Sequence, residues 1–350
     1  MQRLQTIFLN VTDACNLRCS HCYANAKKSR KQCQDESELN LDEITNLAVE
    51  AKKLGAERVN LTGGEPFLRK DWFEIFKIFN SLDFLVGFSS NGTLINRKIA
   101  SCLSKFTNVE FLISLDGDRE NHELMRGVPN SFDKTIKAIR LLQDMKIPLQ
   151  INTTINKANY SSVPFLTKFS RDEDLSLRLT LLNCSTGRGK ENKDKALSTE
   201  QIVNLINYCH EVRQRGSLVF LNLPPLLLQT EDIIPIGNPS CGWAKGLCGV
   251  LPNGNVSICA LAYEHSELSA GNLRENSLEE IWLSSNLFND LRKLETQELE
   301  GICGKCRFRD ICGGGCRLSA YLNYNSFLGP CSICQEFYDK GLLKDELLTS

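Results

Sequence analysis

Strands and helices alternate over residues 6–222 of this 350-residue chain, and this alternation limits the folds that it can adopt. Residues 6–11 are typical of a first strand, and a second is expected at 58–62. Further strands are expected near residues 84–88, 109–115, 148–155, 176–183 and 218–222. Apolar stripes with helical spacing predict helices over residues 41–54, 70–81, 95–105, 132–145, 160–169 and 199–215. Such alternation predicts a parallel α/β sheet.

Three cysteines in a short loop follow the first predicted strand. Cys15, Cys19 and Cys22 have the spacing C-x3-C-x2-C, so their thiols can converge on one metal centre. An iron–sulfur cube that only carries electrons takes four thiolates, and three would leave one iron free to bind another molecule. A zinc site with His21 as the fourth ligand fits the same spacing. The loop alone predicts a metal centre and leaves both kinds open.

A glycine-rich turn follows the second predicted strand, where Gly63, Gly64, Glu65 and Pro66 come directly after residues 58–62. Glycines at the C-terminal end of a strand let a ligand approach the backbone, and a neighbouring carboxylate can accept from an ammonium group. Glycine and proline are equally the usual residues of a tight strand-to-helix turn.

Polar residues also end the next two predicted strands. Asn91 follows residues 84–88, and Ser114 and Asp116 stand at the end of residues 109–115. The carboxyl ends of parallel strands meet at one edge, where such groups can hold a ribose. Asn-Gly and Asp-Gly are also ordinary turn pairs, so the pattern permits either interpretation.

Cysteines return in the last part of the chain. Nine of the sixteen lie there, at Cys241, Cys248, Cys259, Cys303, Cys306, Cys312, Cys316, Cys331 and Cys334. No signal peptide precedes the first motif, so metal ligation is favoured over disulfide bonding. A pair of structural zinc sites is one way to use them. A helix over residues 278–294 separates the two groups of cysteines.

Composition excludes several classes of partner. The formal net charge is −1, which gives no basic surface for nucleic acid or anionic membrane. No apolar run approaches the ~20 residues of a membrane span. Exposed low-potential clusters need a reducing, oxygen-poor setting, so we expect a cytoplasmic protein of an anaerobic or microaerobic cell.

The C-x3-C-x2-C loop and the Gly-Gly-Glu-Pro turn together resemble the motifs of the radical SAM superfamily. The resemblance implies a [4Fe–4S] cluster on Cys15, Cys19 and Cys22, whose free iron binds S-adenosylmethionine. It implies further cofactor contacts at His21, Gly63, Gly64, Glu65, Asn91, Ser114, Asp116 and Arg126. His21 would lie against the adenine. The implied fold is a partial (β/α)6 barrel, and the implied chemistry is reductive cleavage of S-adenosylmethionine to a 5′-deoxyadenosyl radical.

The C-terminal cysteines resemble the SPASM extension of radical SAM peptide maturases, with the order C-x12-G-x4-C, then C-x2-C-x5-C-x3-C, then C. The resemblance implies two auxiliary [4Fe–4S] clusters. The first would use Cys241, Cys248, Cys259 and Cys316. The second would use Cys303, Cys306 and Cys312, completed by Cys331 or Cys334. We therefore expect a radical SAM partial barrel over residues 1–222, a proline-interrupted linker over 223–240 and a SPASM domain over 241–350.

The resemblance points first to oxidative modification of a side chain in a ribosomally made peptide or protein. Because the first motif starts at Cys15, a separate leader-peptide-binding protein is a candidate partner, and a flavodoxin or ferredoxin is the expected reductant. Tailoring of a haem precursor or another small molecule is the alternative, in which Arg188 would pair with a propionate. A flexible polar loop explains Arg188 and its flanking glycines as well. The alternative from another class is an electron-transfer protein without S-adenosylmethionine chemistry.

Overall fold

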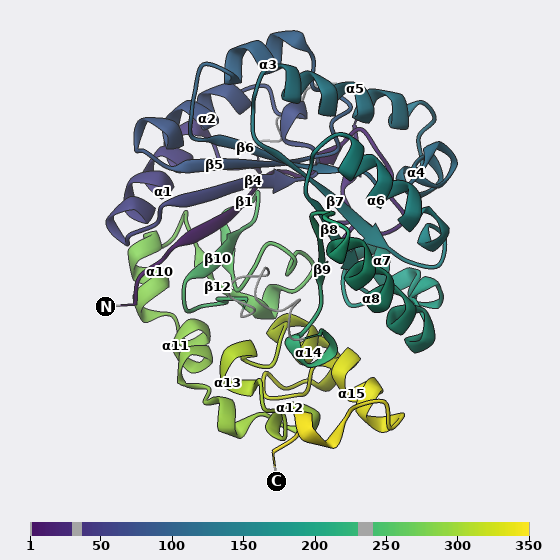
Figure 1. Cartoon of the computed structure of the whole chain (residues 1–350). Helices are drawn as coiled ribbons and strands as arrows, with labels where there is room; N and C mark the ends of the chain where they lie inside the picture. The colour runs from purple at the N-terminus through teal and green to yellow at the C-terminus, as the bar shows by residue number, and fades with distance from the viewer. Residues whose placement is uncertain (1, 30–36, 230–240, 350) are drawn as a thin grey trace.

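The computed structural model of the chain describes residues 2–29, 37–229 and 241–349. Its core is a parallel sheet in which each strand lies beside the next one along the chain (Figure 1). The consecutive strands are β1 (Thr6–Thr12), β4 (Arg58–Gly63), β5 (Leu85–Ser90), β6 (Val109–Ser114), β7 (Leu149–Ile155), β8 (Leu177–Leu181) and β9 (Val219–Asn222). The predicted parallel α/β barrel sheet is confirmed.

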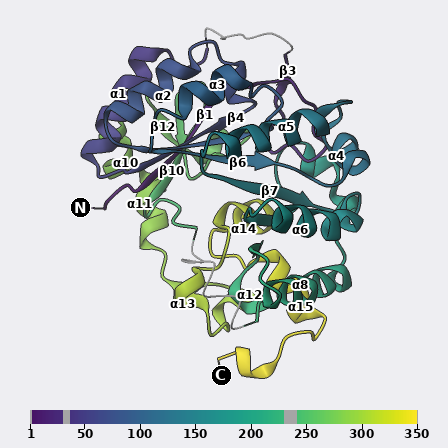
Figure 2. The same cartoon turned by 45° about the horizontal axis from the view of Figure 1, so that its top comes forward.

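Helices lie on the outer side of this sheet (Figure 2). They are α1 (Leu41–Lys53), α2 (Trp72–Ser81), α3 (Arg97–Leu103), α4 (Arg119–Arg126), α5 (Ser131–Asp144), α6 (Val163–Asp172), α7 (Gly187–Glu191) and α8 (Thr199–Gln214). Capping boxes begin α1 at Asn40 and α8 at Ser198. Helix α4 was not predicted, because its sequence RENHELMR has too few apolar residues to form a stripe.

The C-terminal part extends the barrel sheet. Strands β10 (Leu247–Val250), β11 (Asn255–Ser257) and β12 (Ser269–Asn272) follow one another at its edge, and β10 pairs in parallel with β1. The sequence indicated only a hairpin turn here, because pairing between such distant segments leaves no local signal.

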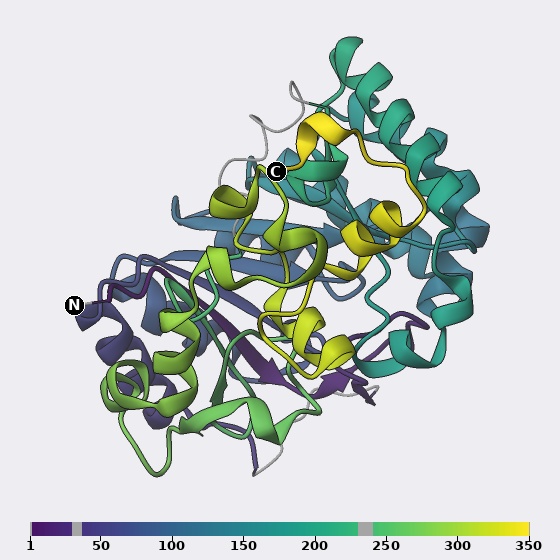
Figure 3. The same ribbon diagram turned by 90° about the horizontal axis from the view of Figure 1, so that it is seen from below.

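Short helices contain three of the C-terminal cysteines, Cys303, Cys312 and Cys334. The predicted helix 278–294 is two helices, α10 (Leu278–Ser284) and α11 (Asn286–Lys293), because Ser285 leaves the helical conformation and caps the second. They are followed by α12 (Gly301–Gly304), α13 (Arg309–Cys312), α14 (Arg317–Tyr324) and α15 (Ser332–Asp339). Seen from below, this yellow-green part lies in front of the barrel strands (Figure 3).

The segment after β9 packs against the protein. Leu223, Leu226 and Leu227 are buried, and a 3-10 turn forms at Pro225–Leu227. Residues 230–240 of the expected linker lie outside the described residues. In the described part of the chain, no helix is both long and apolar enough to cross a membrane.

Candidate functional site

The cysteine loop leaves the end of β1, and its flanks pair as the short strands β2 (Ala14–Cys15) and β3 (Lys27–Lys28). Cys15 and Cys19 are buried and Cys22 is half-buried. Burial, with the neighbouring Cys19 thiol as the next cause, raises the pKa of Cys15 to about 12. Burial likewise raises the pKa of Cys19, to which the Cys22 thiol adds. The loop thus gathers three thiols that a bound cation would convert to thiolates.

Helix α4 supports this loop from one side. The backbone N–H of Arg18 donates to the carbonyl of Arg126 at 3.1 Å, and that of Ser20 donates to the carbonyl of Met125 at 3.0 Å. The last carbonyls of a helix have no partner within it, so the loop satisfies two of them. The helix ends here because Gly127 adopts the left-handed conformation, with φ 67°.

Helix α7 holds the other side of the loop. The Nε of Arg188 donates to the carbonyl of Cys19 at 2.7 Å, and its backbone N–H donates to the carbonyl of Cys22 at 2.9 Å. Asn192 Nδ2 donates to the carbonyl of Ser20 at 3.0 Å. The stretch around Arg188 is therefore a helix rather than a flexible loop, and its side chain binds the cysteine loop.

A buried polar cluster lies beside the loop, formed by His21, Asp116 and Arg126. Asp116 Oδ2 lies 2.7 Å from Arg126 Nε and 3.5 Å from His21 Nε2. Arg126 Nη1 also donates to Cys19 Sγ at 3.5 Å. Burial lowers the pKa of His21 to about 4, which keeps the ring neutral. Burial alone would raise the pKa of Asp116. The nearby Arg126 guanidinium is the main cause that lowers it below its ordinary value.

This cluster carries hydrogen-bonding capacity that the protein does not use. His21 Nδ1 is a buried atom that completes no hydrogen bond with the described residues, whereas Asp116 Oδ2 and Arg126 Nε lie 2.7 Å apart as an ion pair. Buried polar atoms are usually paired, so the unsatisfied His21 nitrogen beside the three thiols fits a polar ligand such as S-adenosylmethionine. The backbone of Asp116 is fixed by His122, whose Nδ1 accepts its N–H at 3.2 Å.

The glycines at the end of β4 have a structural role. A Cβ on Gly63 would lie 2.5 Å from the carbonyl oxygen of Thr12, and one on Gly64 would lie 2.0 Å from that of Ala14. Gly64 donates to Thr12 at 2.8 Å and Glu65 donates to Ala14 at 2.8 Å. Only glycine permits this close approach of β4 to the start of the cysteine loop.

Glu65 is fully buried at the same edge of the sheet. Its carboxylate accepts from Ser90 Oγ at 2.8 Å, from the backbone N–H of Asn91 at 2.9 Å and from that of Phe67 at 3.3 Å. Burial raises the pKa of Glu65 to about 7 although these donors oppose the shift. The Asn91 side chain donates to Asn16 of the cysteine loop at 3.0 Å. Ser114 is half-buried at the end of β6.

Three cysteines of the implied first auxiliary set lie together. The thiol of Cys316 is a neighbouring charge for both Cys241 and Cys259, and after burial it is the largest cause that raises the pKa of each.

Cys248 is set apart from them. It is fully buried on β10, and the charged group beside it is the Arg292 guanidinium. A Cβ on the next residue, Gly249, would lie 2.3 Å from the backbone of Cys259. Because side chains alternate along a strand, Cys248 points to the face of β10 opposite Cys259. The structure brings together three of the four implied ligands and does not bring Cys248 to them.

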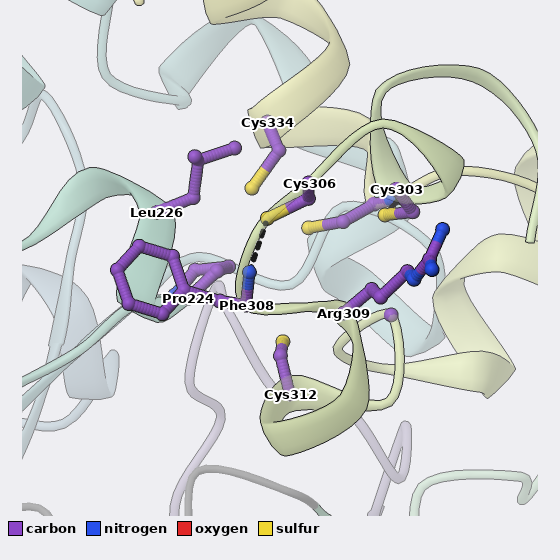
Figure 4. Close-up of a pocket in the computed structure, with 10 residues that line it drawn as sticks. Pro224, Leu226, Cys303, Cys306, Phe308, Arg309, Cys312 and Cys334 are labelled. Atoms are coloured by element: carbon purple, nitrogen blue, oxygen red, sulfur yellow. Dashed lines mark hydrogen bonds between the residues drawn. The ribbon is translucent and has the colours of Figure 1, made fainter. Parts of the chain in front are cut away.

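The implied second auxiliary set lines one pocket (Figure 4), with Cys303, Cys306, Cys312, Cys331 and Cys334. The sulfur atoms of Cys306, Cys312 and Cys334 point toward the same space. Backbone N–H groups donate to two of the thiols, from Phe308 to Cys306 at 3.3 Å and from Cys331 to Cys303 at 3.2 Å. Both Cys331 and Cys334 line the pocket.

Apolar residues of the segment after β9, Pro224 and Leu226, cover this pocket (Figure 4). Thiols with N–H donors in an apolar setting are the environment of protein-bound iron–sulfur clusters. Among the described residues, no three Cys, His, Asp or Glu side chains converge closely enough to share a single metal ion.

Comparison with known families agrees with this geometry. The sequence profile of the radical SAM superfamily matches residues 9–164, and that of the SPASM iron–sulfur cluster-binding domain matches residues 241–307. The chain is a radical SAM enzyme with a SPASM domain. The cysteine loop and the end of β4 lie in the first match, and the cysteines from Cys241 to Cys306 lie in the second.

Relatives of this radical SAM–SPASM enzyme cover nearly its whole length. The AdoMet-dependent heme synthase of Methanosarcina barkeri is 27% identical over 93% of this chain and 94% of its own. The mycofactocin maturase MftC of Mycobacterium tuberculosis is 29% identical over 96% of this chain and 84% of its own. Streptococcus suis SuiB bound to its precursor peptide SuiA has the same fold, with a TM-score of 0.75, 18% identity and coverage of 96% and 76%.

Several residues that shape the site have structural roles that the sequence analysis did not predict. Arg188 and Asn192 hold the carbonyls of the cysteine loop, and His122 accepts from Asp116. Tyr23, which directly follows Cys22, places its hydroxyl 3.3 Å from Asn10 Oδ1 and 3.2 Å from Thr62 Oγ1. These contacts join segments far apart in the chain, so spacing alone cannot indicate them.

Proposed function

We propose that this radical SAM–SPASM enzyme oxidatively modifies a side chain of a ribosomally made peptide or protein. The observation that carries the radical chemistry is the cysteine loop with the unsatisfied His21 nitrogen and the buried Asp116–Arg126 pair beside it. A [4Fe–4S] cluster on Cys15, Cys19 and Cys22, when bound with S-adenosylmethionine, supplies a 5′-deoxyadenosyl radical that abstracts a hydrogen atom.

The residues of the chain prepare this chemistry. Cys15, Cys19 and Cys22 hold the cluster, and Arg188 fixes the loop that carries them. Gly63, Gly64 and Glu65, with Asn91 and Ser114, form the edge where the methionyl and ribose groups bind. Asp116 and Arg126, paired with each other beside the loop, would contact the same ligand, and the neutral ring of His21 would lie against the adenine.

The C-terminal thiols are proposed to hold two auxiliary [4Fe–4S] clusters. Cys303, Cys306 and Cys312, with Cys331 or Cys334, form the second site. Cys241, Cys259 and Cys316 form the first, and Cys248 completes it only if β10 turns its side chain over. After hydrogen-atom abstraction the substrate radical must lose one more electron to complete a net two-electron oxidation, and an auxiliary cluster would be a suitable acceptor for it.

Peptide modification is supported by the similarity to MftC, which is called a maturase, and by the fold of SuiB, which binds a precursor peptide. A flavodoxin or ferredoxin is the proposed reductant, and a leader-peptide-binding protein is a possible partner. A cytoplasmic location is part of the same proposal.

A second candidate is tailoring of a haem precursor. It is supported by the AdoMet-dependent heme synthase that matches over 93% of this chain. Arg188 would then have to leave the carbonyl of Cys19 to reach a propionate. This contact weighs against the role predicted for Arg188 while leaving the substrate class itself open to test.

The radical chemistry is tested by release of 5′-deoxyadenosine from S-adenosylmethionine under reduction, in the wild type and a Cys15/Cys19/Cys22→Ala variant. We expect release only by the wild type, and about twelve irons per chain falling to about eight in the variant. A protein that only transfers electrons would release none.

The substrate class is tested by incubating the reduced enzyme and S-adenosylmethionine with iron-coproporphyrin III or with short peptides encoded beside its gene. Mass spectrometry should show a peptide product of altered mass. A changed porphyrin with unchanged peptides would instead support the haem-precursor candidate.

A further inference from the structure

Arg317 is a buried cation between the two groups of C-terminal cysteines, at the start of α14. It is 1% exposed and directly follows Cys316. Its guanidinium lies close enough to interact electrostatically with four cysteines when these are thiolates, namely Cys303, Cys312, Cys316 and Cys331. No function of the cysteine sites described above uses this side chain.

Among the described residues, Arg317 has no anionic side chain as a partner. Its Nη1 donates to the carbonyls of Phe327 and Gly329, both at 2.8 Å, and its Nη2 donates to that of Gly314. Its Nε completes no hydrogen bond with any residue that the structure describes. Within the described residues, no carboxylate forms an ion pair with it.

Such a charge is costly unless something compensates it. A guanidinium does not lose its proton in proteins, and a buried charge without a counter-charge is strongly destabilising. The neutral carbonyls of Gly314, Phe327 and Gly329 offset only part of that cost. Iron–sulfur clusters ligated by thiolates carry a net negative charge, and the thiols around Arg317 are those proposed to ligate them.

We propose that Arg317 is the counter-charge of the auxiliary clusters and raises their reduction potentials. A nearby positive charge stabilises the more negative, reduced state of a cluster, and burial strengthens this effect because solvent screens it little. The larger effect falls on the second cluster, whose candidate ligands Cys303, Cys312 and Cys331 are three of the four thiols near the guanidinium. Arg317 is a positioning residue that acts through the clusters. The inference rests on the auxiliary clusters of the proposed function.

A matched control is available in Arg309. It lines the pocket of the second site, and its Nη1 donates to the carbonyl of Gly304 at 3.0 Å. Its side chain is 28% exposed and lies 3.8 Å from the Asp310 carboxylate. Water and this carboxylate already screen the charge of Arg309, so its removal should affect the clusters less than removal of Arg317.

The test is a redox titration of the auxiliary clusters, followed by electron paramagnetic resonance. The full chain carries Cys15/Cys19/Cys22→Ala so that only C-terminal iron contributes, and Arg317→Gln, Arg317→Lys and Arg309→Gln are compared in this background. We expect Arg317→Gln to move the midpoint potentials to more negative values and Arg317→Lys to keep them near those of the parent. Arg309→Gln should give a smaller shift.

Iron and sulfide analysis separates the possible failures. A parent protein without C-terminal iron would overturn the auxiliary clusters and this inference with them. Full iron with unchanged potentials in Arg317→Gln, or an equal shift in Arg309→Gln, would overturn the inference alone. If Arg317→Gln fails to assemble, recovery of iron in Arg317→Lys supports a charge effect. Equal loss in both variants would show that Arg317 only binds the three carbonyls.

Discussion

Asp116 is the residue on which the buried cluster beside the cysteine loop depends. Besides its contacts with Arg126 and His21, its Oδ1 accepts from the backbone N–H of Thr154 at 3.1 Å. It joins the ends of β6 and β7 to the loop. A single side chain therefore fixes the position of the two groups proposed to meet the cofactor.

Replacing Asp116 with Asn should leave the Arg126 guanidinium buried without its counter-charge. Breaking a buried pair in this way costs about 3–5 kcal/mol, and urea unfolding should show a loss of that size. Asp118→Asn is the control, because Asp118 caps α4 by accepting from Asn121 at 3.1 Å and Asn caps a helix equally well. Equal losses in the two variants would contradict a special role for Asp116.

Glu65 gives the protein a predicted pH dependence. Its pKa is about 7 in the fold because of burial, above its ordinary value of 4.5. The folded state therefore binds the Glu65 proton more tightly than the unfolded state does. The resulting contribution to the free energy of unfolding is fully present below about pH 4.5 and is lost as the pH rises through about 7. The unfolding midpoint of Glu65→Gln should lack this decline between pH 5 and pH 7.5.

Glu43→Gln tests the opposite sign. A hydrogen bond from Arg274 is the largest cause that lowers the pKa of Glu43, so the contribution of Glu43 to stability is lost as the pH falls.

An unchanged pH profile in Glu65→Gln would show that the Glu65 carboxylate is ionised in the fold, as its three hydrogen-bond donors favour.

At the scale of elements, the short helix α7 is expected to hold the cysteine loop in shape. Arg188→Ala removes the donor to the carbonyl of Cys19. After reconstitution, this variant should contain fewer than the about four irons expected at the N-terminal site of the wild type. Its C-terminal iron should be unchanged. Lys190→Ala, on the exposed side of the same helix, should keep both. Normal N-terminal iron in Arg188→Ala would show that the loop needs no such support.

The elements themselves were predictable where the sequence has a period. Helices α1 and α8 have apolar stripes and capping boxes, and both were predicted. Helix α4 has no apolar stripe that would predict it from the sequence. Its contact with the cysteine loop stabilises it instead. The pairing of β10 with β1 depends on tertiary structure and leaves no local pattern.

The same distinction applies to the candidate site. The spacing of Cys15, Cys19 and Cys22 is local, so the sequence indicated their grouping directly. The separation of Cys248 from Cys259 depends on which face of β10 each occupies. The roles of Arg188 and Arg317 depend on carbonyls supplied by distant segments. Residues that act through such contacts become visible only in three dimensions.

At the scale of the whole molecule, Trp282 ties the C-terminal part to the start of the chain. It is fully buried on α10, and its Nε1 donates to the carbonyl of Gln2 at 2.8 Å. The ring of Phe288 lies 5.3 Å away, and the Arg292 guanidinium lies 4.4 Å above the indole. This contact and the β1–β10 pairing predict that the barrel and the C-terminal part unfold together.

Trp282→Ala should therefore destabilise both parts by about 3–5 kcal/mol. Circular dichroism should report the helices, and in a Cys15/Cys19/Cys22→Ala background the visible absorption of the auxiliary clusters should report the C-terminal part. Both signals should change at the same, lowered denaturant concentration. The half-exposed Leu342 provides the control, Leu342→Ala, which should change neither. Two separate transitions in Trp282→Ala would mean that the parts are independent.

The pairing of Ile7 with Cys248 also bears on how the protein is made. A ribosome releases β1 early and β10 late. The edge of β1 that pairs with β10 is therefore unpaired during most of translation. Unpaired strand edges invite association between nascent chains. The sheet is therefore completed only near the end of synthesis, and slower synthesis of the stretch between α8 and β10 would lengthen the interval in which newly made chains can aggregate.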